Sequence, residues 1–201
     1  MAERLLTAIA GPMFSGKTEE VVRQTTRAEI AGKQVQVFKP LIDNRYGALA
    51  TVKSHSGSEH SAIPVQTAVD ILEHMESGTN LVVIDEIQFF GPEIVSVIET
   101  LLERGTDVVI AGLPLDFRGE VFGQMGTLLA KADRAVHLTA VCDYSEDGGI
   151  CGREATRTQR LIDGSPADYN DPIVLIGGRN EGYVARCPTH HVVPGKPERE
   201  L

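Results

Sequence analysis

The sequence predicts an α/β protein with a mainly parallel sheet flanked by helices, followed by a small loop-rich domain. Over the first 139 residues, short apolar runs rich in β-branched residues alternate with segments of helical periodicity, as in chains that build parallel sheets. All three cysteines fall after residue 140, where glycine and aspartate cluster and no long helix is expected. We therefore expect an α/β domain at 1–139, a small domain at 140–193 and a disordered tail at 194–201.

Each expected element follows from its residue pattern. Strands are predicted at 4–10, 34–39, 81–84, 107–113 and 134–138, where short apolar runs are bounded by turn residues. Helices are predicted at 17–31, at 67–75 behind a possible Thr67–Asp70 capping box, between Pro92 and Gly105, and at 123–132. Residues 40–63 have few apolar residues in any period and predict a long loop, which in a compact domain is commonly functional.

The composition and charge exclude several classes of protein. The chain has 201 residues, of which 42% are hydrophobic, and its formal net charge is −9. An acidic chain lacks the basic face that binds nucleic acid or anionic lipid, so neither is an expected partner. No apolar run approaches the roughly 18 residues that a membrane span needs, and the N-terminal apolar stretch is too short for a secretory signal. We expect a cytoplasmic protein.

The strongest functional motif is GPMFSGKT, a full match to the phosphate-binding pattern GxxxxGK[ST]. It follows a predicted strand and opens a predicted helix, a context in which backbone N–H groups and the helix N-terminus hold a triphosphate. Lys17 is expected to reach the β- and γ-phosphates, and the Thr18 hydroxyl to bind Mg²⁺. An ordinary glycine-rich turn is the alternative. The candidate ATP-binding residues are Gly11, Pro12, Met13, Phe14, Ser15, Gly16, Lys17 and Thr18.

A second motif, LVVIDE, places two acidic residues directly after a buried strand. Because such an acid lies beside the metal at the carboxyl end of its strand, we expect Asp85 to bind Mg²⁺ and Glu86 to accept a proton from the nucleophile. Gln88 is expected to lie near the nucleotide. Water as nucleophile would make an ATPase, and DEIQ also fits a helicase-like motor. Motors usually need two cores and a basic track, so a small-molecule kinase fits this short, acidic chain better.

The cysteines predict a metal site rather than disulfides. Cys187 and His190 form a Cys-x-x-His pair, while Cys142 and Cys151 have eight residues between them. Four such ligands suit a closed, tetrahedral structural Zn²⁺ site that stabilises a small domain. His191 is an alternative fourth ligand, and buried thiols without a metal are the alternative for the whole set.

The chain resembles the zinc-containing, type II class of cellular thymidine kinases from Gly11 to about His191. The resemblance rests on GPMFSGKT, on FKPLIDNRY at 38–46, on DEIQFF at 85–90, on AGLPLDFRGEVFG at 111–123, and on the cysteine-containing segments 141–160 and 176–187. Two features depart from the family pattern. About six residues are inserted between the first two cysteines, and Pro188 stands where a basic residue is usual.

The resemblance implies transfer of the ATP γ-phosphate to the 5′-hydroxyl of thymidine by a core related to recombinase-type ATPases. It also implies a zinc-stapled lid, a homotetramer and dTTP as a feedback ligand. Glu86 is then the general base, and Lys17, Arg45 and Asp43 lie near the transferring phosphate. Without the resemblance, the aromatic residues would be interpreted as core, and a silent nucleotide-binding module stays an alternative. The expected thymidine pocket comprises Met13, Phe89, Leu113, Phe117, Phe122, Thr158, Ile173, Leu175, Gly177 and Tyr183.

Overall fold

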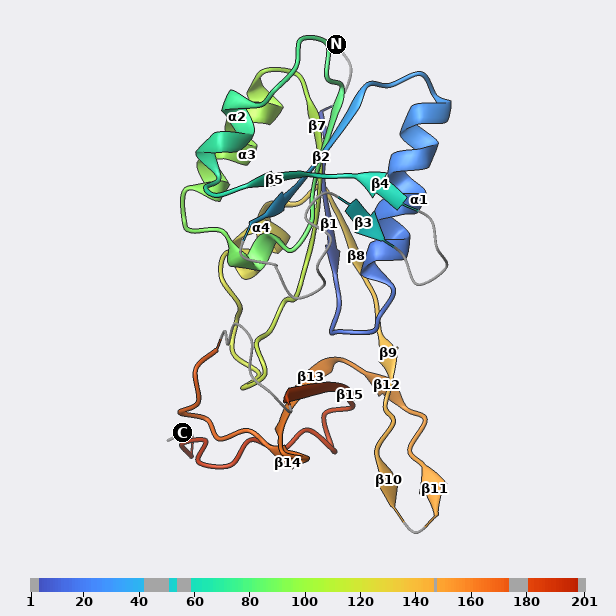
Figure 1. Ribbon diagram of the computed structural model, residues 1–201, viewed down its shortest axis with the longest axis vertical. Coiled ribbons are helices and arrows are strands. Elements are labelled where there is room, and N and C mark those ends of the chain that lie inside the picture. Colours follow the sequence, from blue (N-terminus) through green and yellow to red (C-terminus); the bar gives the residue numbers. More distant parts are fainter. Residues whose placement is uncertain (1–3, 42–50, 54–58, 147, 174–180, 199–201) are drawn as a thin grey trace.

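The structure is a computed structural model in which residues 4–41, 51–53, 59–146, 148–173 and 181–198 are described. Six strands form a sheet whose neighbouring pairs are all parallel, in the order β5-β2-β6-β7-β1-β8 (Figure 1). The expected parallel α/β sheet is therefore confirmed. The strands are β1 (Leu6–Ala10), β2 (Val35–Pro40), β5 (Ile63–Val65), β6 (Leu81–Ile84), β7 (Asp107–Gly112) and β8 (Arg134–His137).

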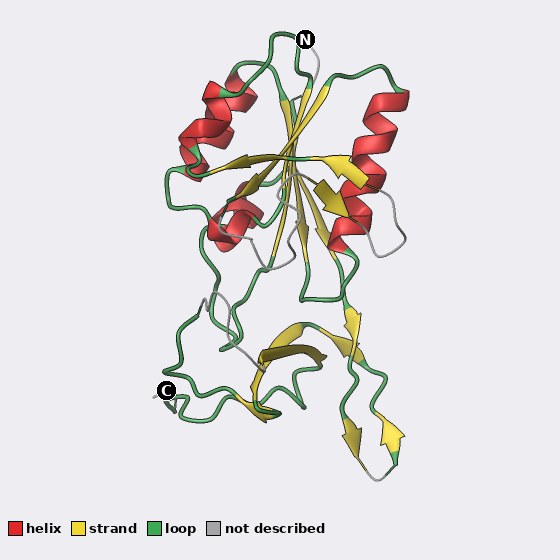
Figure 2. Ribbon diagram, in the orientation of Figure 1, coloured by secondary structure: helices red, strands yellow, loops and turns green. Residues whose placement is uncertain are grey.

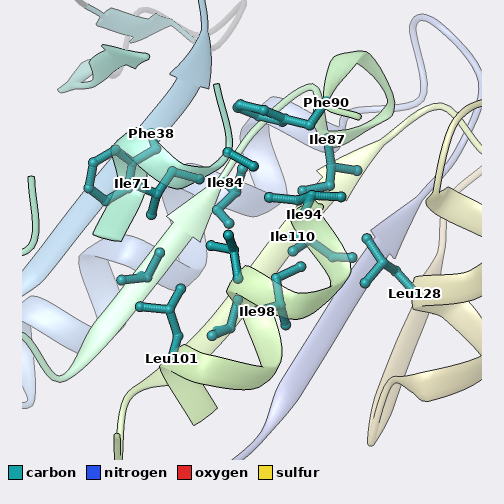
Figure 3. Close-up of a cluster of buried hydrophobic side chains, with 14 of the residues drawn as sticks. Phe38, Ile71, Ile84, Ile87, Phe90, Ile94, Ile98, Leu101, Ile110 and Leu128 are labelled. Carbon is teal, nitrogen blue, oxygen red and sulfur yellow. The ribbon is translucent and has the colours of Figure 1, made fainter. Parts of the chain in front are cut away.

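Helices cover both faces of this sheet (Figure 2). Helix α1 (Lys17–Ile30) lies on one face, and α2 (Val69–Glu73), α3 (Ile94–Glu103) and α4 (Met125–Lys131) lie on the other. The larger hydrophobic core fills the space between the sheet and the second group of helices, and includes Phe38, Ile84, Ile98 and Ile110 (Figure 3). Ile87 and Phe90, which follow β6, belong to the same core and fix the path of the chain after that strand.

The segment 40–63 differs from the long loop predicted for it. Thr51–Lys53 (β3) and Glu59–Ser61 (β4) pair as antiparallel strands, and Ile63–Val65 adds a sixth strand at the edge of the main sheet. Strands of three residues are too short to produce a periodic apolar signal. Pro64 is compatible with β5 because an edge strand has one side without a hydrogen-bonded neighbour.

The predicted helix boundaries are accurate to a few residues. At α2 the main chain of Thr67 donates to Asp70 Oδ2 (2.9 Å), and the main chain of Asp70 donates to Thr67 Oγ1 (3.4 Å). The capping interaction expected from the sequence is therefore confirmed. Helix α2 nevertheless ends at Glu73, two residues before the predicted limit.

The residues after 139 form short antiparallel strands below the carboxyl edge of the main sheet, as viewed in Figure 1. Their buried apolar cluster is small, consisting of Ala140, Cys142, Ala155, Ala185 and Cys187. Among the described residues, no helix is both long enough and apolar enough to cross a bilayer. The short strands are β9 (Ala140–Val141), β10 (Ser145–Glu146), β11 (Gly149–Ile150), β12 (Glu154–Ala155), β13 (Arg157–Ile162), β14 (Ser165–Pro166) and β15 (Glu181–Arg186).

Candidate functional site

The glycine-rich segment 11–16 connects the carboxyl end of β1 to the first turn of α1, as its motif predicts. Gly16 has a φ of 82°, and Phe14 adopts a φ of 65° that is uncommon for a residue with a side chain. A Cβ on Gly11 would lie 2.7 Å from the carbonyl oxygen of Leu138, so only glycine fits where the loop passes β8. The loop is thus a tight turn whose backbone conformation depends on its sequence.

Lys17 is a buried cation at the base of this loop. Its Nζ donates to the carbonyl oxygen of Pro12 at 2.8 Å, an oxygen that also accepts from Ser15 Oγ at 2.8 Å. Burial lowers the pKa of Lys17, although the negative charges of Glu86 and Asp85 act in the opposite direction and raise it. A buried ammonium facing carboxylates at a glycine-rich loop is suited to an anionic ligand and its metal.

Asp85 and Glu86 follow β6 at the same edge of the sheet as the glycine-rich loop. The carboxylate of Asp85 is buried, and its Oδ1 accepts the main-chain N–H of Glu86 at 2.9 Å. Glu86 has a φ of 51° and begins the short 3₁₀ turn η2 (Ile87–Phe89). Gln88 is buried in this turn, where its Nε2 donates to Glu86 Oε2 at 2.5 Å and its Oε1 accepts from the main chain of Leu113 at 3.0 Å.

A cavity lies beside the glycine-rich loop, lined by residues from segments that follow strands of the main sheet and from the small antiparallel region. The described residues expected to surround thymidine all line it, together with Asp116, which the sequence did not single out. Leu175, Gly177, Asp43 and Arg45 lie outside the described residues. The lining comprises Met13, Phe89, Leu113, Asp116, Phe117, Phe122, Thr158, Ile173 and Tyr183.

Polar contacts tie the antiparallel region to the cavity wall. The main chain of Met13 donates to Thr158 Oγ1 at 3.0 Å, which joins the glycine-rich loop to β13. Phe117 is held from two sides, because its carbonyl oxygen accepts from His191 Nε2 at 2.8 Å and the Arg160 guanidinium lies 5.4 Å from its ring centroid. The bond to a carbonyl requires the proton of His191 to be on Nε2.

Asp116 shapes the loop that carries Phe117. Its buried carboxylate accepts the main-chain N–H groups of Arg118 (2.9 Å) and Glu120 (3.0 Å) and pairs with the Arg118 guanidinium at 2.8 Å. Lys196, from the expected disordered tail, donates to the carbonyl oxygen of Arg118 at 2.6 Å. The Asp116 bonds are local, reaching two and four residues along the chain, whereas the Lys196 bond joins segments 78 residues apart.

Three cysteines and one histidine converge in the antiparallel region. The ligand atoms of Cys142, Cys151, Cys187 and His190 all lie within 4.8 Å of one another. His190 Nδ1 is 3.6 Å from the sulfurs of both Cys142 and Cys187, and Cys151 Sγ is 4.0 Å from Cys187 Sγ. Metal–ligand lengths of about 2.3 Å for sulfur and 2.0 Å for nitrogen give tetrahedral edges of roughly 3.5–3.8 Å, close to these separations.

This geometry favours His190 over His191 as the fourth ligand, since His191 points to Phe117. It also accounts for the wide spacing between the first two cysteines. The extra residues form the β10–β11 hairpin, whose base is closed by a 2.8 Å bond from the main chain of Cys151 to the carbonyl of Tyr144. The inserted residues therefore loop out and leave both sulfurs in the cluster, which is consistent with a structural zinc site.

Comparison with known proteins places the chain in a family. The sequence model of the family described as thymidine kinase matches residues 4–191. A curated thymidine kinase from Coprothermobacter proteolyticus is 52% identical over 191 residues, which is 95% of this chain and 92% of that protein. The chain belongs to the thymidine kinase family. It is accordingly a phosphotransferase that uses ATP, and the resemblance stated from the motifs is confirmed.

Comparison with solved structures gives matches of low sequence identity and low TM-score. The genome packaging NTPase B204 of Sulfolobus turreted icosahedral virus 2, in complex with ATP-gammaS, is 12% identical and has a TM-score of 0.44, covering 73% of this chain and 78% of that one. The cytoplasmic domain of the type VII secretion ATPase EccC of Thermomonospora curvata is 10% identical and has a TM-score of 0.43. The match covers 92% of this chain and 24% of that one.

Proposed function

We propose that this protein transfers the γ-phosphoryl group of ATP to the 5′-hydroxyl of thymidine. The observation that carries the proposal is that one cavity adjoins the phosphate-binding loop and is linked to the candidate base, Glu86, through Leu113 and Gln88. Met13 belongs to the loop and lines the cavity, while Leu113 lines the cavity and is hydrogen-bonded to Gln88, the partner of Glu86. An acceptor in the cavity would therefore lie between the phosphate donor and the carboxylate.

The chemistry assigned to these groups is an in-line displacement. The 5′-hydroxyl oxygen of thymidine forms a bond to the γ-phosphorus while Glu86 accepts the proton of that hydroxyl. The bond from the γ-phosphorus to the bridging oxygen breaks and releases ADP. Lys17 binds the β- and γ-phosphates, and we place Arg45 and Asp43 near the transferring group by family resemblance. The oxygen donors Thr18 and Asp85 suit Mg²⁺, which would neutralise phosphate charge.

The wall of the cavity supports a pyrimidine nucleoside as acceptor. Phe89 and Phe122 meet edge to face with ring centroids 5.5 Å apart, and Phe117 and Tyr183 also line the cavity, so its wall offers aromatic surfaces on which a flat base could stack. We assign base reading to main-chain groups of 173–178, by family resemblance. Thymine and cytosine differ in donor and acceptor at two edge positions, so a cytosine would leave buried polar groups unpaired. The thymine methyl adds only about 1 kcal/mol, so deoxyuridine is expected to be accepted moderately.

We further propose that Zn²⁺ occupies the cluster of Cys142, Cys151, Cys187 and His190 as a structural ion. Burial raises the pKa of the Cys187 thiol, but hydrogen bonds from the main-chain N–H groups of His190 and Thr189 and from the thiols of Cys142 and Cys151 together outweigh burial and bring that pKa to about 7. Hydrogen bonds from the backbone stabilise this sulfur as a thiolate, which is the form that binds a metal cation. By family resemblance, we also propose a homotetramer inhibited by dTTP, which light scattering and inhibition kinetics would test.

The proposed activity is tested with purified protein, Mg²⁺ and ATP, by following ADP and TMP with and without thymidine. We expect equal amounts of ADP and TMP, little ADP without thymidine, negligible product from deoxycytidine, and strong loss of turnover in Glu86→Gln. ATP hydrolysis without TMP would indicate an ATPase, in which case stimulation by nucleic acid would be the next measurement. A Glu86→Gln variant as active as the wild type would remove Glu86 as the base.

A further inference from the structure

The amide of Gln88 joins Glu86 to the end of β7, and we propose that it is a positioning residue that holds the Glu86 carboxylate for proton transfer. The inference rests on the proposed function, and it gives Gln88 a different role from the nucleotide contact expected from the sequence. Its basis is a pair of hydrogen bonds made by one buried side chain, at 2.5 Å to Glu86 and 3.0 Å to Leu113.

The chemistry of the two partners fixes the orientation of the amide. The main-chain N–H of Leu113 can only donate, so the amide oxygen of Gln88 must face it. The amide nitrogen then faces Glu86, where it donates to Oε2. The amide N–H donates to one oxygen of the Glu86 carboxylate, so this bond fixes the direction in which a general base at Glu86 points.

The surroundings leave Gln88 little freedom to turn. The turn that carries it is anchored by Ile87 and Phe90, both buried in the main core (Figure 3). A Cβ on Gly112 would lie 2.5 Å from Gln88 Oε1, and a Cβ on Gly123 would collide with the carbonyl oxygen of Gln88. Glycines at both positions allow the side chain and main chain of Gln88 to sit this close to their neighbours.

The same amide links the base to the acceptor cavity. β7 lies between β6, which ends before Asp85 and Glu86, and β1, which ends at the phosphate-binding loop. Leu113 follows β7 and lines the cavity, so its main chain is a fixed point on the cavity wall. By bonding to that point, Gln88 sets where the Glu86 carboxylate lies relative to the acceptor. Small errors in such placement are costly in phosphoryl transfer, which relies mainly on positioning.

Two substitutions separate the contributions of the two bonds. Gln88→Glu keeps an oxygen to accept from Leu113 but replaces the donor that faces Glu86, whereas Gln88→Met removes both bonds at similar volume. We expect kcat to fall about 10- to 100-fold in each variant, the range for loss of a hydrogen bond to a charged group. The KM for ATP should stay within about twofold, since no nucleotide contact is lost. A large rise in that KM with an unchanged kcat would overturn the proposal in favour of a nucleotide contact.

Gln36 provides a matched control. It is also buried, and its amide likewise joins separate segments: Oε1 accepts from the main chain of Glu76 (3.0 Å) and from Thr79 Oγ1 (2.7 Å), and Nε2 donates to the carbonyl of His74 (2.9 Å). These contacts lie near the amino end of β2, away from the site. Gln36→Met should lower the urea midpoint and leave kcat unchanged. A similar loss of kcat in Gln36→Met and Gln88→Met would show that general loosening, not positioning, reduces turnover.

A double-mutant cycle with Glu86→Gln tests whether Gln88 acts through Glu86. If it does, adding Gln88→Met to Glu86→Gln should lower kcat by less than about twofold, because the base is already lost. Additive losses would overturn the inference. The wild type and the Glu86→Gln single variant test the proposed function separately. An absence of TMP from the wild type would refute that function. An inactive Glu86→Gln together with a fully active Gln88→Met would refute only the role of Gln88.

Discussion

Removal of zinc should unfold the antiparallel region while leaving the parallel sheet folded. The small region has a buried cluster of only five residues, and two of them, Cys142 and Cys187, are candidate metal ligands. The other members of that cluster are the alanines Ala140, Ala155 and Ala185, whose methyl groups together contribute roughly 2 kcal/mol at about 0.8 kcal/mol each. Structural zinc contributes about 10–16 kcal/mol in small zinc-dependent peptides, so bound zinc would stabilise this region far more than the alanines do.

Hydrogen exchange followed by mass spectrometry would show directly whether the antiparallel region depends on zinc more than the parallel sheet does. After chelation, with zinc loss verified by elemental analysis, we expect amide protection to disappear from β9, β12, β13 and β15 and to persist in β1, β6 and β7. The persistence is expected because the parallel sheet has its own core between the strands and α2–α4. Addition of zinc should restore protection, which controls for irreversible damage.

The same treatment has a functional consequence. Phe117 is held by His191 and Arg160, and Met13 by Thr158, so unfolding of the antiparallel region would release the cavity wall. The KM for thymidine should therefore rise more than the KM for ATP. Unchanged exchange in β13 and β15 after verified loss of zinc would refute the reasoning, because it would show that the alanine cluster and the strand pairing suffice without the metal.

Three further predictions concern single features of the structure. Lys17→Met should abolish TMP formation because the phosphates lose their cation. Because burial lowers the pKa of Lys17, the unfolded chain binds that proton more tightly, so this variant should also have a higher free energy of unfolding at pH 7, with the gain fading as pH rises toward 10.5; urea unfolding that shows a loss at pH 7 would contradict this. Deletion of 145–150 should preserve zinc content and kcat, because the ends of the hairpin already meet in a 2.8 Å hydrogen bond, and metal loss in the deletion variant would count against that account. Lys196→Met should raise the KM for thymidine about two- to tenfold by freeing the Arg118 carbonyl and Glu120, and an equal rise in the KM for ATP would contradict a local effect.

The sequence predicted those parts of the fold and site that are encoded by neighbouring residues. Buried parallel strands appear as continuous apolar runs, so β1, β6 and β7 are visible without any structure. The phosphate-binding loop is recognisable because its glycines and Lys17 lie in one uninterrupted stretch of sequence. By contrast, β5 has three residues, one of them proline, and leaves no periodic signal.

The parts that sequence patterns could not predict depend on contacts between distant segments. Gln88 meets Leu113 only because β6 and β7 are adjacent in the sheet, although the residues are 25 positions apart. The bonds that Asp116 accepts lie within its own loop, but its place on the cavity wall depends on how that loop packs against distant residues. Aromatic residues such as Phe117 have the pattern of ordinary core residues, so family resemblance, not periodicity, suggested their place around a cavity.

The register of three adjacent strands ultimately sets the geometry proposed for catalysis. Ala10 on β1 pairs with Gly112 on β7, and Ile110 on β7 pairs with Ile84 on β6, so all three strands end at the same edge. The residues that follow them are the phosphate-binding loop, the cavity wall at Leu113, and the acids from Asp85 onward. A slip of one residue would turn every side chain of a strand to the other face and bury the wrong groups, so the core opposes it strongly. Core packing around Ile84 and Ile110, just before the strand ends, therefore fixes the relative positions of donor, acceptor and base on which phosphoryl transfer depends.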